Sequence, residues 1–345
     1  MKFGPSRRTF VGLTTTAVAL PFARPRGRKS KEFVTCRFGI NLCGTEFPEK
    51  SVPTITELDY YRSRGIYTFR LPIRWEFVQP DLMRLLDTSY VNLFRKLIDY
   101  AAKHGQRILL DIHNFGRYKD VPIGSDLVPA TALVDLWTRL ATLLSGHPGL
   151  KGYDIMNEPH DLPAMTTWPR VAQAVVDAIR RIDFVTPIYI EGDGWSNAKD
   201  WRDHGHLNTC LNIRDPAGKI IYSAHVYADW DKTGRYTKSF EDDGATTDIL
   251  IDRFRVFHDW LQDKGFRGHV GECGVPADSG WLACLDAFVA YLSRQTDIVG
   301  MDYWAGGPAW GEYALSIEPI NGADRPQMNI LSKYAAPQLR APTRF

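Results

Sequence analysis

The sequence predicts an α/β protein folded as a single (β/α)8 TIM barrel. Short apolar runs typical of β-strands alternate with longer amphipathic stretches typical of α-helices, and eight such units fit into about 310 residues. Polar side chains also gather at the carboxyl ends of the runs, which is the edge where barrel enzymes carry their sites. Both observations favour one barrel over two smaller domains.

The expected strands follow one another without a fixed repeat or a low-complexity linker after residue 31. They cover Phe38–Gly44, Thr68–Ile73, Arg107–His113, Gly152–Glu158, Pro187–Asp193, Ile220–Tyr227, His269–Gly274 and Ile298–Gly306. Helices are expected between them, most clearly at Tyr90–His104, Thr131–Ser145, Trp168–Asp183, Asp248–Lys264 and Trp281–Arg294. Several of these stretches end at glycine, as helices often do. We therefore expect one catalytic domain over residues 32–345.

A doubly wound open sheet is the competing architecture for alternating strands and helices. The Gly-x-Gly-x-x-Gly turn that nucleotide-binding sheets place after their first strand does not follow Phe38–Gly44. The barrel is therefore the preferred prediction.

Residues 1–31 have the pattern of an export signal. They hold eight basic residues and no acidic one, and Arg7-Arg8 precedes the uncharged stretch Phe10–Ala23, which is too short to span a bilayer. The twin arginine resembles a Tat-type signal, and a disordered basic tail is the alternative. We expect a periplasmic or secreted monomer without stable membrane insertion.

The charge of the remaining chain argues against nucleic acid as a partner. The full chain carries 42 Lys and Arg against 40 Asp and Glu. Without residues 1–31 the balance is 34 against 40, and a mildly acidic domain lacks the basic surface that binds phosphate backbones.

Two glutamates stand out among the polar residues at the strand ends. Glu158 closes the fourth run and Glu272 lies near the end of the seventh. Other polar or aromatic groups in equivalent places are Arg70, Asp111, His113, Asn114, Asn157, His225, Tyr227 and Trp304. Each taken singly is more often structural, but burying this much charge together without a function is costly. Because parallel barrel strands end on one face, we expect a carboxylate pair surrounded by hydrogen-bond donors.

Such a pair suits the cleavage of an acetal. One carboxyl delivers a proton to the leaving oxygen while the other, kept ionised by a different environment, stabilises the oxocarbenium-like centre. A separation of about 5 Å favours the retaining, double-displacement route. In this interpretation Arg70 keeps the nucleophile ionised, Tyr227 orients it, Asn157 donates to a sugar 2-hydroxyl, and Trp304 forms the floor under the ring.

Other chemistries find little support in the sequence. The strand histidines His113, His225 and His269 belong to no His-x-His or His-Glu-x-x-His pattern that would indicate a metal, and we expect no metal and no other cofactor. A Gly-x-Ser-x-Gly turn and a Gly-Lys-Ser/Thr phosphate loop are absent. Without a Cys-x-x-Cys pattern we expect buried thiols and no disulfide framework from Cys36, Cys43, Cys210, Cys273 and Cys284.

Six stretches resemble glycoside hydrolase family 5, the cellulase-type enzymes with catalytic acids on strands 4 and 7. In the family's order, and each on the expected strand, they are Phe69–Pro72, Leu110–Asn114, Met156–Pro159, His225–Tyr227, Gly271–Glu272 and Tyr303–Pro308. The resemblance spans residues 37–335 and implies that Glu158 is the general acid/base and Glu272 the nucleophile. It also implies that Arg70, His113, Asn157, His225, Tyr227 and Trp304 complete the site; we add Asn114 and Trp310 as substrate-binding candidates.

The segments Gly39–Phe47, His113–Tyr118 and Leu315–Pro319 look like the endoglucanase subgroup of that family. The resemblance therefore implies a retaining endo-β-1,4-glucanase, a cellulase, with β-glucan chains or oligosaccharides as substrate. The alternatives are a β-mannanase or a mixed-linkage or β-1,3-glucanase of the same family and, from another class, a non-catalytic carbohydrate-binding barrel. Ala309 before Trp310, and Cys273 after the nucleophile, depart from the subgroup's pattern at the subsites.

Five further tryptophans are candidate platforms for sugar rings. They are Trp75, Trp195, Trp230, Trp281 and Trp310, of which Trp310 is best placed and Trp75 has rim packing as its alternative. We expect Trp137, Trp168, Trp201 and Trp260, on helices or their ends, to be core or surface residues.

Overall fold

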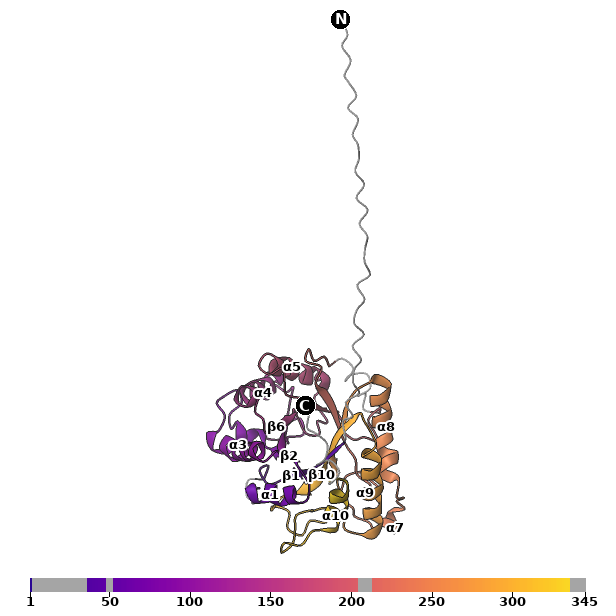
Figure 1. Ribbon diagram of the computed structural model, residues 1–345. Coiled ribbons are helices and arrows are strands. Elements are labelled where there is room, and N and C mark those ends of the chain that lie inside the picture. Colours follow the sequence, from indigo (N-terminus) through magenta and orange to yellow (C-terminus); the bar gives the residue numbers. More distant parts are fainter. Residues whose placement is uncertain (2–35, 48–51, 204–212, 336–345) are drawn as a thin grey trace. The chain divides into compact units, whose positions relative to one another are not determined.

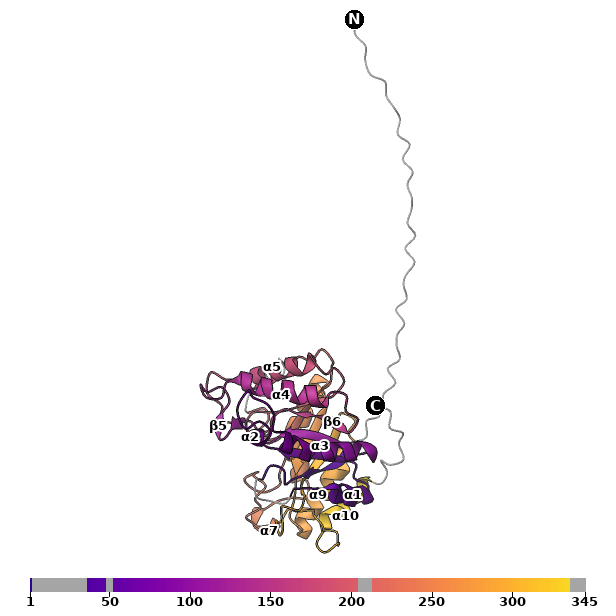
Figure 2. The same cartoon turned by 90° about the vertical axis from the view of Figure 1, so that its left-hand side faces the viewer.

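Eight parallel strands close into a barrel with helices outside it (Figures 1 and 2). The computed structural model describes residues 1, 36–47, 52–203 and 213–335. Hydrogen-bonded neighbours run in the order β1, β10, β9, β8, β7, β6, β3, β2, and β1 pairs with both β10 and β2. The predicted (β/α)8 barrel is confirmed. The predicted export signal, beyond Met1, lies outside the described residues.

All eight predicted strands are present. They are β1 (Arg37–Leu42), β2 (Thr68–Ile73), β3 (Arg107–Ile112), β6 (Leu150–Asp154), β7 (Ile188–Glu191), β8 (Ile220–His225), β9 (Gly268–Cys273) and β10 (Ile298–Gly306). A small antiparallel pair, β4 (Arg117–Tyr118) and β5 (Val121–Pro122), lies in the loop after β3.

The largest boundary difference is at the fourth barrel strand, which was expected to continue to Glu158 but ends at Asp154. The chain then bends across β3, where the N–H of Asn157 donates to the carbonyl of Ile112 at 2.8 Å. Glu158 itself adopts a left-handed backbone with φ of 42°, a conformation that cannot continue a strand. The catalytic candidate therefore lies on a bend beyond the strand.

The five predicted helices are present within a few residues of their expected bounds. The helices are α1 (Ile55–Ser63), α2 (Trp75–Val78), α3 (Thr88–Lys103), α4 (Ala130–Leu144), α5 (Trp168–Arg180), α7 (Phe240–Asp243), α8 (Ile249–Lys264), α9 (Ser279–Leu292) and α10 (Pro326–Ala335). The α8 helix ends at Gly265, whose φ of 67° supplies the left-handed cap that glycine adopts without strain. Among the described residues, we find no helix with the length and apolarity to cross a bilayer.

Apolar side chains fill the space between the strands and the helices. Trp137, Trp168, Trp201 and Trp260 are at most 1% exposed there, which assigns them to the core. A separate small cluster is formed by Leu109, Tyr189, Ile221 and Val299. Since side chains alternate along a strand, Ile221, Ser223 and His225 share one face of β8, and an apolar, a polar and an ionisable residue follow one another toward its carboxyl end.

The cysteines match the expectation in the part of the chain that the structure covers. Cys36, Cys43, Cys273 and Cys284 are buried free thiols. Cys210 lies in residues 204–212, outside the described residues.

Candidate active site

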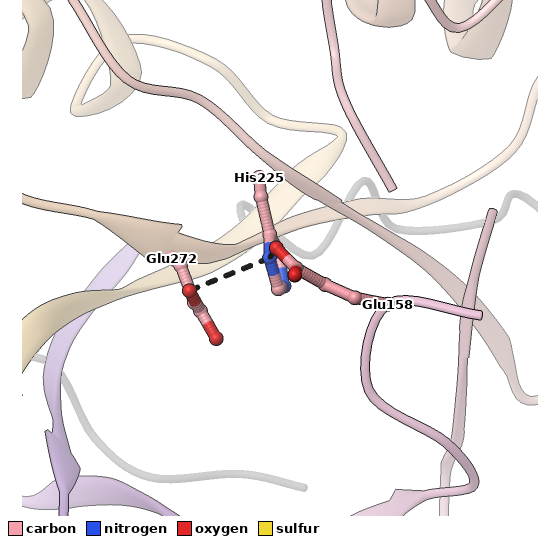
Figure 3. Close-up of side chains that lie close together, drawn as sticks. All are labelled: Glu158, His225 and Glu272. Atoms are coloured by element: carbon pink, nitrogen blue, oxygen red, sulfur yellow. Dashed lines mark hydrogen bonds and ion pairs between the residues drawn. The ribbon is translucent and has the colours of Figure 1, made fainter. Parts of the chain in front are cut away.

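Glu158, His225 and Glu272 meet at the carboxyl end of the barrel (Figure 3). One side-chain nitrogen or oxygen atom of each lies within 4.8 Å of the others. His225 is the last residue of β8 and Glu272 is in β9, while Glu158 reaches the same point from the bend after β6. The two glutamates predicted from separate strands are thus brought together.

Glu272 is held at both carboxylate oxygens. Its Oε1 accepts a hydrogen bond from Arg70 Nη1 at 3.1 Å, and its Oε2 accepts one from the Tyr227 hydroxyl at 2.8 Å. Burial raises the pKa of Glu272 above its ordinary value, with Glu158 adding to the rise and His225 and Arg70 opposing it. The carboxylate is therefore fixed in position by two donors, one in β2 and one just beyond the end of β8.

Glu158 occupies a more open and differently bonded position. Its side chain is 18% exposed, against 6% for Glu272. Its Oε1 accepts from His225 Nδ1 at 2.7 Å, and its backbone N–H donates to Glu191 Oε2 at 2.7 Å. The two carboxyls therefore differ in exposure and in partners, as separate acid and nucleophile roles require.

His225 bridges two carboxylates. Its Nδ1 faces Glu158, and its Nε2 lies 2.9 Å from Glu191 Oε1. Burial by itself lowers the pKa of His225, but Glu191 and Glu272 reverse this and raise it well above its ordinary value. Both ring nitrogens then donate, and His225 is an imidazolium.

Arg70 is the hub of the site and is fully buried. Its guanidinium lies within 3.1 Å of carboxylate oxygens of Asp111, Asp154, Glu191 and Glu272, and it also donates to the amide oxygens of Asn41 and Asn157. One guanidinium cannot neutralise four carboxylates.

The surplus negative charge around Arg70 is reflected in the carboxyl groups. Burial raises the pKa of Asp111 to about 7 and that of Asp154 well above its ordinary value. Burial also acts against ionised Glu191, but His225 and Arg70 outweigh it and lower its pKa to about 2. Glu191 therefore carries its charge throughout the neutral range, while Asp111 and Asp154 resist ionisation.

His113, Asn157 and Trp304 form a second group beside the carboxylates. The His113 ring is nearly parallel to Trp304, with centroids 5.5 Å apart. Burial lowers the pKa of His113 to about 4, so it is neutral, with Nδ1–H donating to Asp111 at 2.8 Å and Nε2 accepting weakly from Asn157 Nδ2 at 3.5 Å. The peptide between Trp304 and Ala305 is cis.

Aromatic residues continue outward from Trp304. Trp310 packs edge-on against Trp304 and Phe47, with centroids 5.6 and 5.4 Å apart, and stacks on Tyr313 at 4.6 Å. Burial raises the pKa of Tyr313 to about 12, and Glu272 adds to the rise. The structure thus places Trp310 in a half-buried aromatic wall that extends toward Glu272.

A cavity of about 540 Å³ opens beside Glu158. Trp195, 45% exposed, stacks on His160 at 4.4 Å and lines this cavity. The other lining residues include Asn197, Asp200, Tyr227, Lys232 and Arg235. Trp230 is 53% exposed but lies under Lys238 and is not part of this lining.

Two predicted aromatic platforms are wrong. Trp75 is fully buried, donates from Nε1 to Gln79 at 3.1 Å, and packs against Tyr118. Trp281 is 1% exposed and is packed between Tyr236 and Phe240. Both rings are buried, so neither presents a face to a ligand.

Asn114 lies near the site but is engaged elsewhere. Its Oδ1 accepts from the N–H of Trp75 at 2.7 Å, and its Nδ2 donates to Glu76 Oε2 at 2.6 Å. Both ends of the amide therefore hold the start of α2, and a sugar contact for Asn114 stays a prediction.

Sequence reasoning missed Glu191 and Tyr313. Glu191 closes a predicted strand, which is the same signal that identified Glu158 and Glu272, so it was available. Tyr313 belongs to an irregular loop after β10 and approaches the site only through the packing of that loop. The sequence offered no comparable signal for it.

The cluster of Glu158, His225 and Glu272 also has the spacing of possible metal ligands. Both nitrogens of His225 already donate to carboxylates, and an imidazolium has no lone pair for a metal. The sequence does contain one His-x-His pattern, His204-Gly205-His206, which lies outside the described residues. The described donors therefore fit a proton-handling site better than a metal site.

Two glutamates of different exposure at the mouth of a (β/α)8 barrel, one just beyond β6 and one in β9, suit the paired carboxyl groups of a glycoside hydrolase, and the fold and site define that class. The chain matches the family model for cellulase (glycosyl hydrolase family 5) over residues 30–307. It belongs to this family of enzymes.

Individual relatives agree with this assignment. The endoglucanase Cel5A of Pseudomonas stutzeri, solved in complex with cellobiose, is 40% identical with a TM-score of 0.80, covering 90% of this chain and 96% of its own. A probable endo-beta-1,4-glucanase B of Neosartorya fischeri is 30% identical over an alignment that covers 97% of this chain and 99% of the relative. The manganese dependent endoglucanase Eg5A of Phanerodontia chrysosporium is 26% identical, covering 84% of this chain and 77% of the relative.

Proposed function

We propose that the protein is a retaining endo-β-1,4-glucanase in which Glu158 is the acid/base and Glu272 the nucleophile. The observation that carries this proposal is the approach of the two side chains within 4.8 Å at the mouth of the barrel. Retaining glycosidases hold their carboxyls about 5 to 5.5 Å apart, whereas inverting ones need roughly 6.5–9.5 Å for an intervening water. The spacing favours double displacement.

In the first step, Glu272 attacks the anomeric carbon while Glu158 protonates the leaving glycosidic oxygen. The bond from the anomeric carbon to that oxygen breaks, and a covalent glycosyl ester forms on Glu272. Arg70 and Tyr227 hold the Glu272 carboxylate for attack. The imidazolium of His225, 2.7 Å from Glu158, stabilises the carboxylate that remains on Glu158 after it gives up its proton.

In the second step, Glu158 takes a proton from water, the water oxygen attacks the anomeric carbon, and Glu272 leaves as a carboxylate. Two inversions restore the original anomeric configuration. Asn157, held between Arg70 and His113, is placed to contact the 2-hydroxyl of the sugar. Trp304 supplies the apolar floor beneath that ring.

The proposed substrate is a β-1,4-glucan chain. It is supported by family membership and by the names of the relatives. The cavity beside Glu158 provides room on the leaving-group side, where Trp195 presents an exposed ring. The aromatic wall of Trp304, Trp310 and Tyr313 extends the site on the other side of the pair.

The test compares carboxymethylcellulose, barley mixed-linkage glucan, β-1,3-glucan and mannan in parallel and follows the anomeric form of fresh product by NMR. We expect rapid loss of viscosity with carboxymethylcellulose and β-configured product. Turnover of mannan alone would replace the substrate assignment, and α-configured product would exclude the retaining route. Binding without turnover of any polysaccharide would indicate a carbohydrate-binding barrel.

We also propose export through the twin-arginine segment before the barrel. It is supported by Arg7-Arg8 and the uncharged stretch that follows. Changing both arginines to lysine should keep the enzyme inside cells that export the unmodified chain. Equal export of both forms would count against a Tat signal.

A further inference from the structure

Glu191, the last residue of β7, is fully buried, and the mechanism above assigns it no step. Its carboxylate contacts Glu158 at the backbone N–H and His225 at Nε2. We propose that Glu191 is the positioning residue of the acid/base. It fixes the backbone of Glu158, and it keeps His225, which faces the Glu158 carboxyl group, doubly protonated. The inference rests on the proposed role of Glu158 and adds the group that controls it.

The backbone contact addresses an unfavourable conformation. Glu158 has a φ of 42°, and a residue with a side chain adopts this region only where its surroundings hold it. The 2.7 Å bond from its N–H to Glu191 Oε2 is charge-assisted and joins the bend after β6 to the end of β7. Glu191 therefore determines where the Glu158 side chain begins.

The second contact determines the charge of His225. A neutral imidazole donates from one nitrogen only, whereas His225 faces a carboxylate at each nitrogen. Glu191, which is buried and cannot be screened by water, keeps the second proton on the ring. Without Glu191, His225 would be neutral, and the carboxylate that Glu158 forms on giving up its proton would have no imidazolium beside it.

Charged groups from several strands face Glu191. Arg70 of β2 lies 2.9 Å from Oε1, the same oxygen that His225 of β8 contacts. Asp111 of β3 and Asp154 of β6 also bond to Arg70, and the Glu191 charge helps to raise the pKa of both. Glu272 of β9 lies 3.5 Å from His225 Nδ1. Only Arg70 and His225 are cations in this set, and they keep Glu191 ionised.

The direct test is Glu191→Gln, which keeps the size of the side chain and removes its charge. Nitrogen-15 NMR of labelled histidine should show that His225 in the unmodified enzyme keeps both protons well above the pH at which a free histidine loses one. In the variant we expect its titration midpoint to fall by one pH unit or more. This readout needs no substrate, so it remains informative even if the proposed glucanase activity is absent. An unchanged midpoint would overturn the inference.

Kinetics separate positioning from general damage. In Glu191→Gln, kcat on cello-oligosaccharides should fall about tenfold or more, because one charge-assisted hydrogen bond is lost from each partner. An aryl cellobioside with a dinitrophenolate leaving group needs little proton donation, so its first step should be much less affected. Equal losses on both substrates would reject a role through the acid/base.

Asp154→Asn is the matched control. Asp154 is equally buried and also bonds to Arg70, at 2.8 Å, but it contacts neither Glu158 nor His225. We expect it to leave the His225 midpoint in place. If Glu191→Gln does not fold, Glu191→Asp replaces it, because this variant keeps the charge on a side chain shorter by one methylene. In Glu191→Asp, His225 should stay doubly protonated. The value of kcat should fall, and KM should not. Neutral His225 in Glu191→Asp would contradict the inference.

Discussion

The barrel interior holds two buried ionic clusters, and they are built differently. The lower cluster consists of Lys151, His269 and Asp302 and lies toward the amino-terminal ends of the barrel strands. In it, Lys151 lies 3.0 Å from Asp302, which also contacts His269 at 3.0 Å. His269 in turn lies 3.1 Å from the Ser223 hydroxyl. The upper cluster lies at the carboxyl-terminal ends of the strands. In it, Arg70 and His225 face the carboxyl groups of Asp111, Asp154, Glu158, Glu191 and Glu272.

The two clusters differ in charge balance. Burial and Lys151 lower the pKa of His269 to about 4, so this ring is neutral and one lysine faces one aspartate. Burial by itself would raise the pKa of Asp302, but Lys151 and His269 lower it below its ordinary value. The lower cluster is therefore a balanced pair that supports the fold. The upper cluster keeps a surplus of carboxylates, which is typical of a working site.

The largest expected effect is on the upper cluster. Glu272→Ala should reduce turnover of β-glucan by about 10⁴-fold or more, because it removes the proposed nucleophile. Binding of cello-oligosaccharides, measured by calorimetry, should persist because the aromatic wall is intact. Added azide should restore some turnover and give an α-configured glycosyl azide. Full activity in the variant would refute the nucleophile assignment.

A substitution that removes the carboxylate of the lower cluster should lower the stability of the fold and leave catalysis unchanged. Asp302→Asn leaves Lys151, whose side chain is 10% exposed, without its carboxylate. The free energy of unfolding should fall by about 3–5 kcal/mol, as measured by urea titration, while the folded fraction keeps its kcat. Replacing the pair together, by Lys151→Met and Asp302→Leu, should recover much of the loss. A defect in kcat at full stability would show that the clusters are functionally linked.

A pH titration separates the clusters without mutation. The folded pKa of Asp302 lies below 3.8, so its stabilising ion pair is complete above that value and is lost as the pH falls through the lower, folded pKa. Burial raises the pKa of Glu272 above its ordinary value, so this proposed nucleophile becomes protonated at a pH where Asp302 is still ionised. As the pH is lowered, kcat/KM should therefore fall before the circular dichroism signal of the folded protein does. Coincident loss of both signals would contradict the separation.

The smallest expected effect is that of a chelator. Arg70 and His225 supply the positive charge of the upper cluster, so dialysis against EDTA should leave kcat unchanged. Because one relative is named a manganese dependent endoglucanase, the control adds Mn²⁺ back after dialysis. Loss of activity on chelation, restored by Mn²⁺, would assign a metal role that the described donors do not indicate.

The strand-end residues show how far the sequence leads. Glu158, His225 and Glu272 were predicted to meet because parallel strands of a barrel end at one edge, and the structure brings them together. The tryptophans show where such reasoning fails. Trp75 and Trp195 both follow barrel strands, yet one is buried against Tyr118 and the other is exposed on His160. Loop packing, which has no short sequence signature, made that difference.

The sequence by itself determined the barrel, the edge that carries the site and the pair of glutamates, because strand periodicity and strand ends are local properties of the chain. Only the tertiary structure decided which groups control that pair. Glu191 acts across three strands, and the bend at Glu158 depends on a contact 33 residues away. The charge balance of each cluster also depends on side chains from several strands. Lys151 pairs with Asp302 across the barrel, whereas Arg70 is shared among four carboxyl groups. These groups come together only when the barrel closes, so the sequence alone does not give their charge balance.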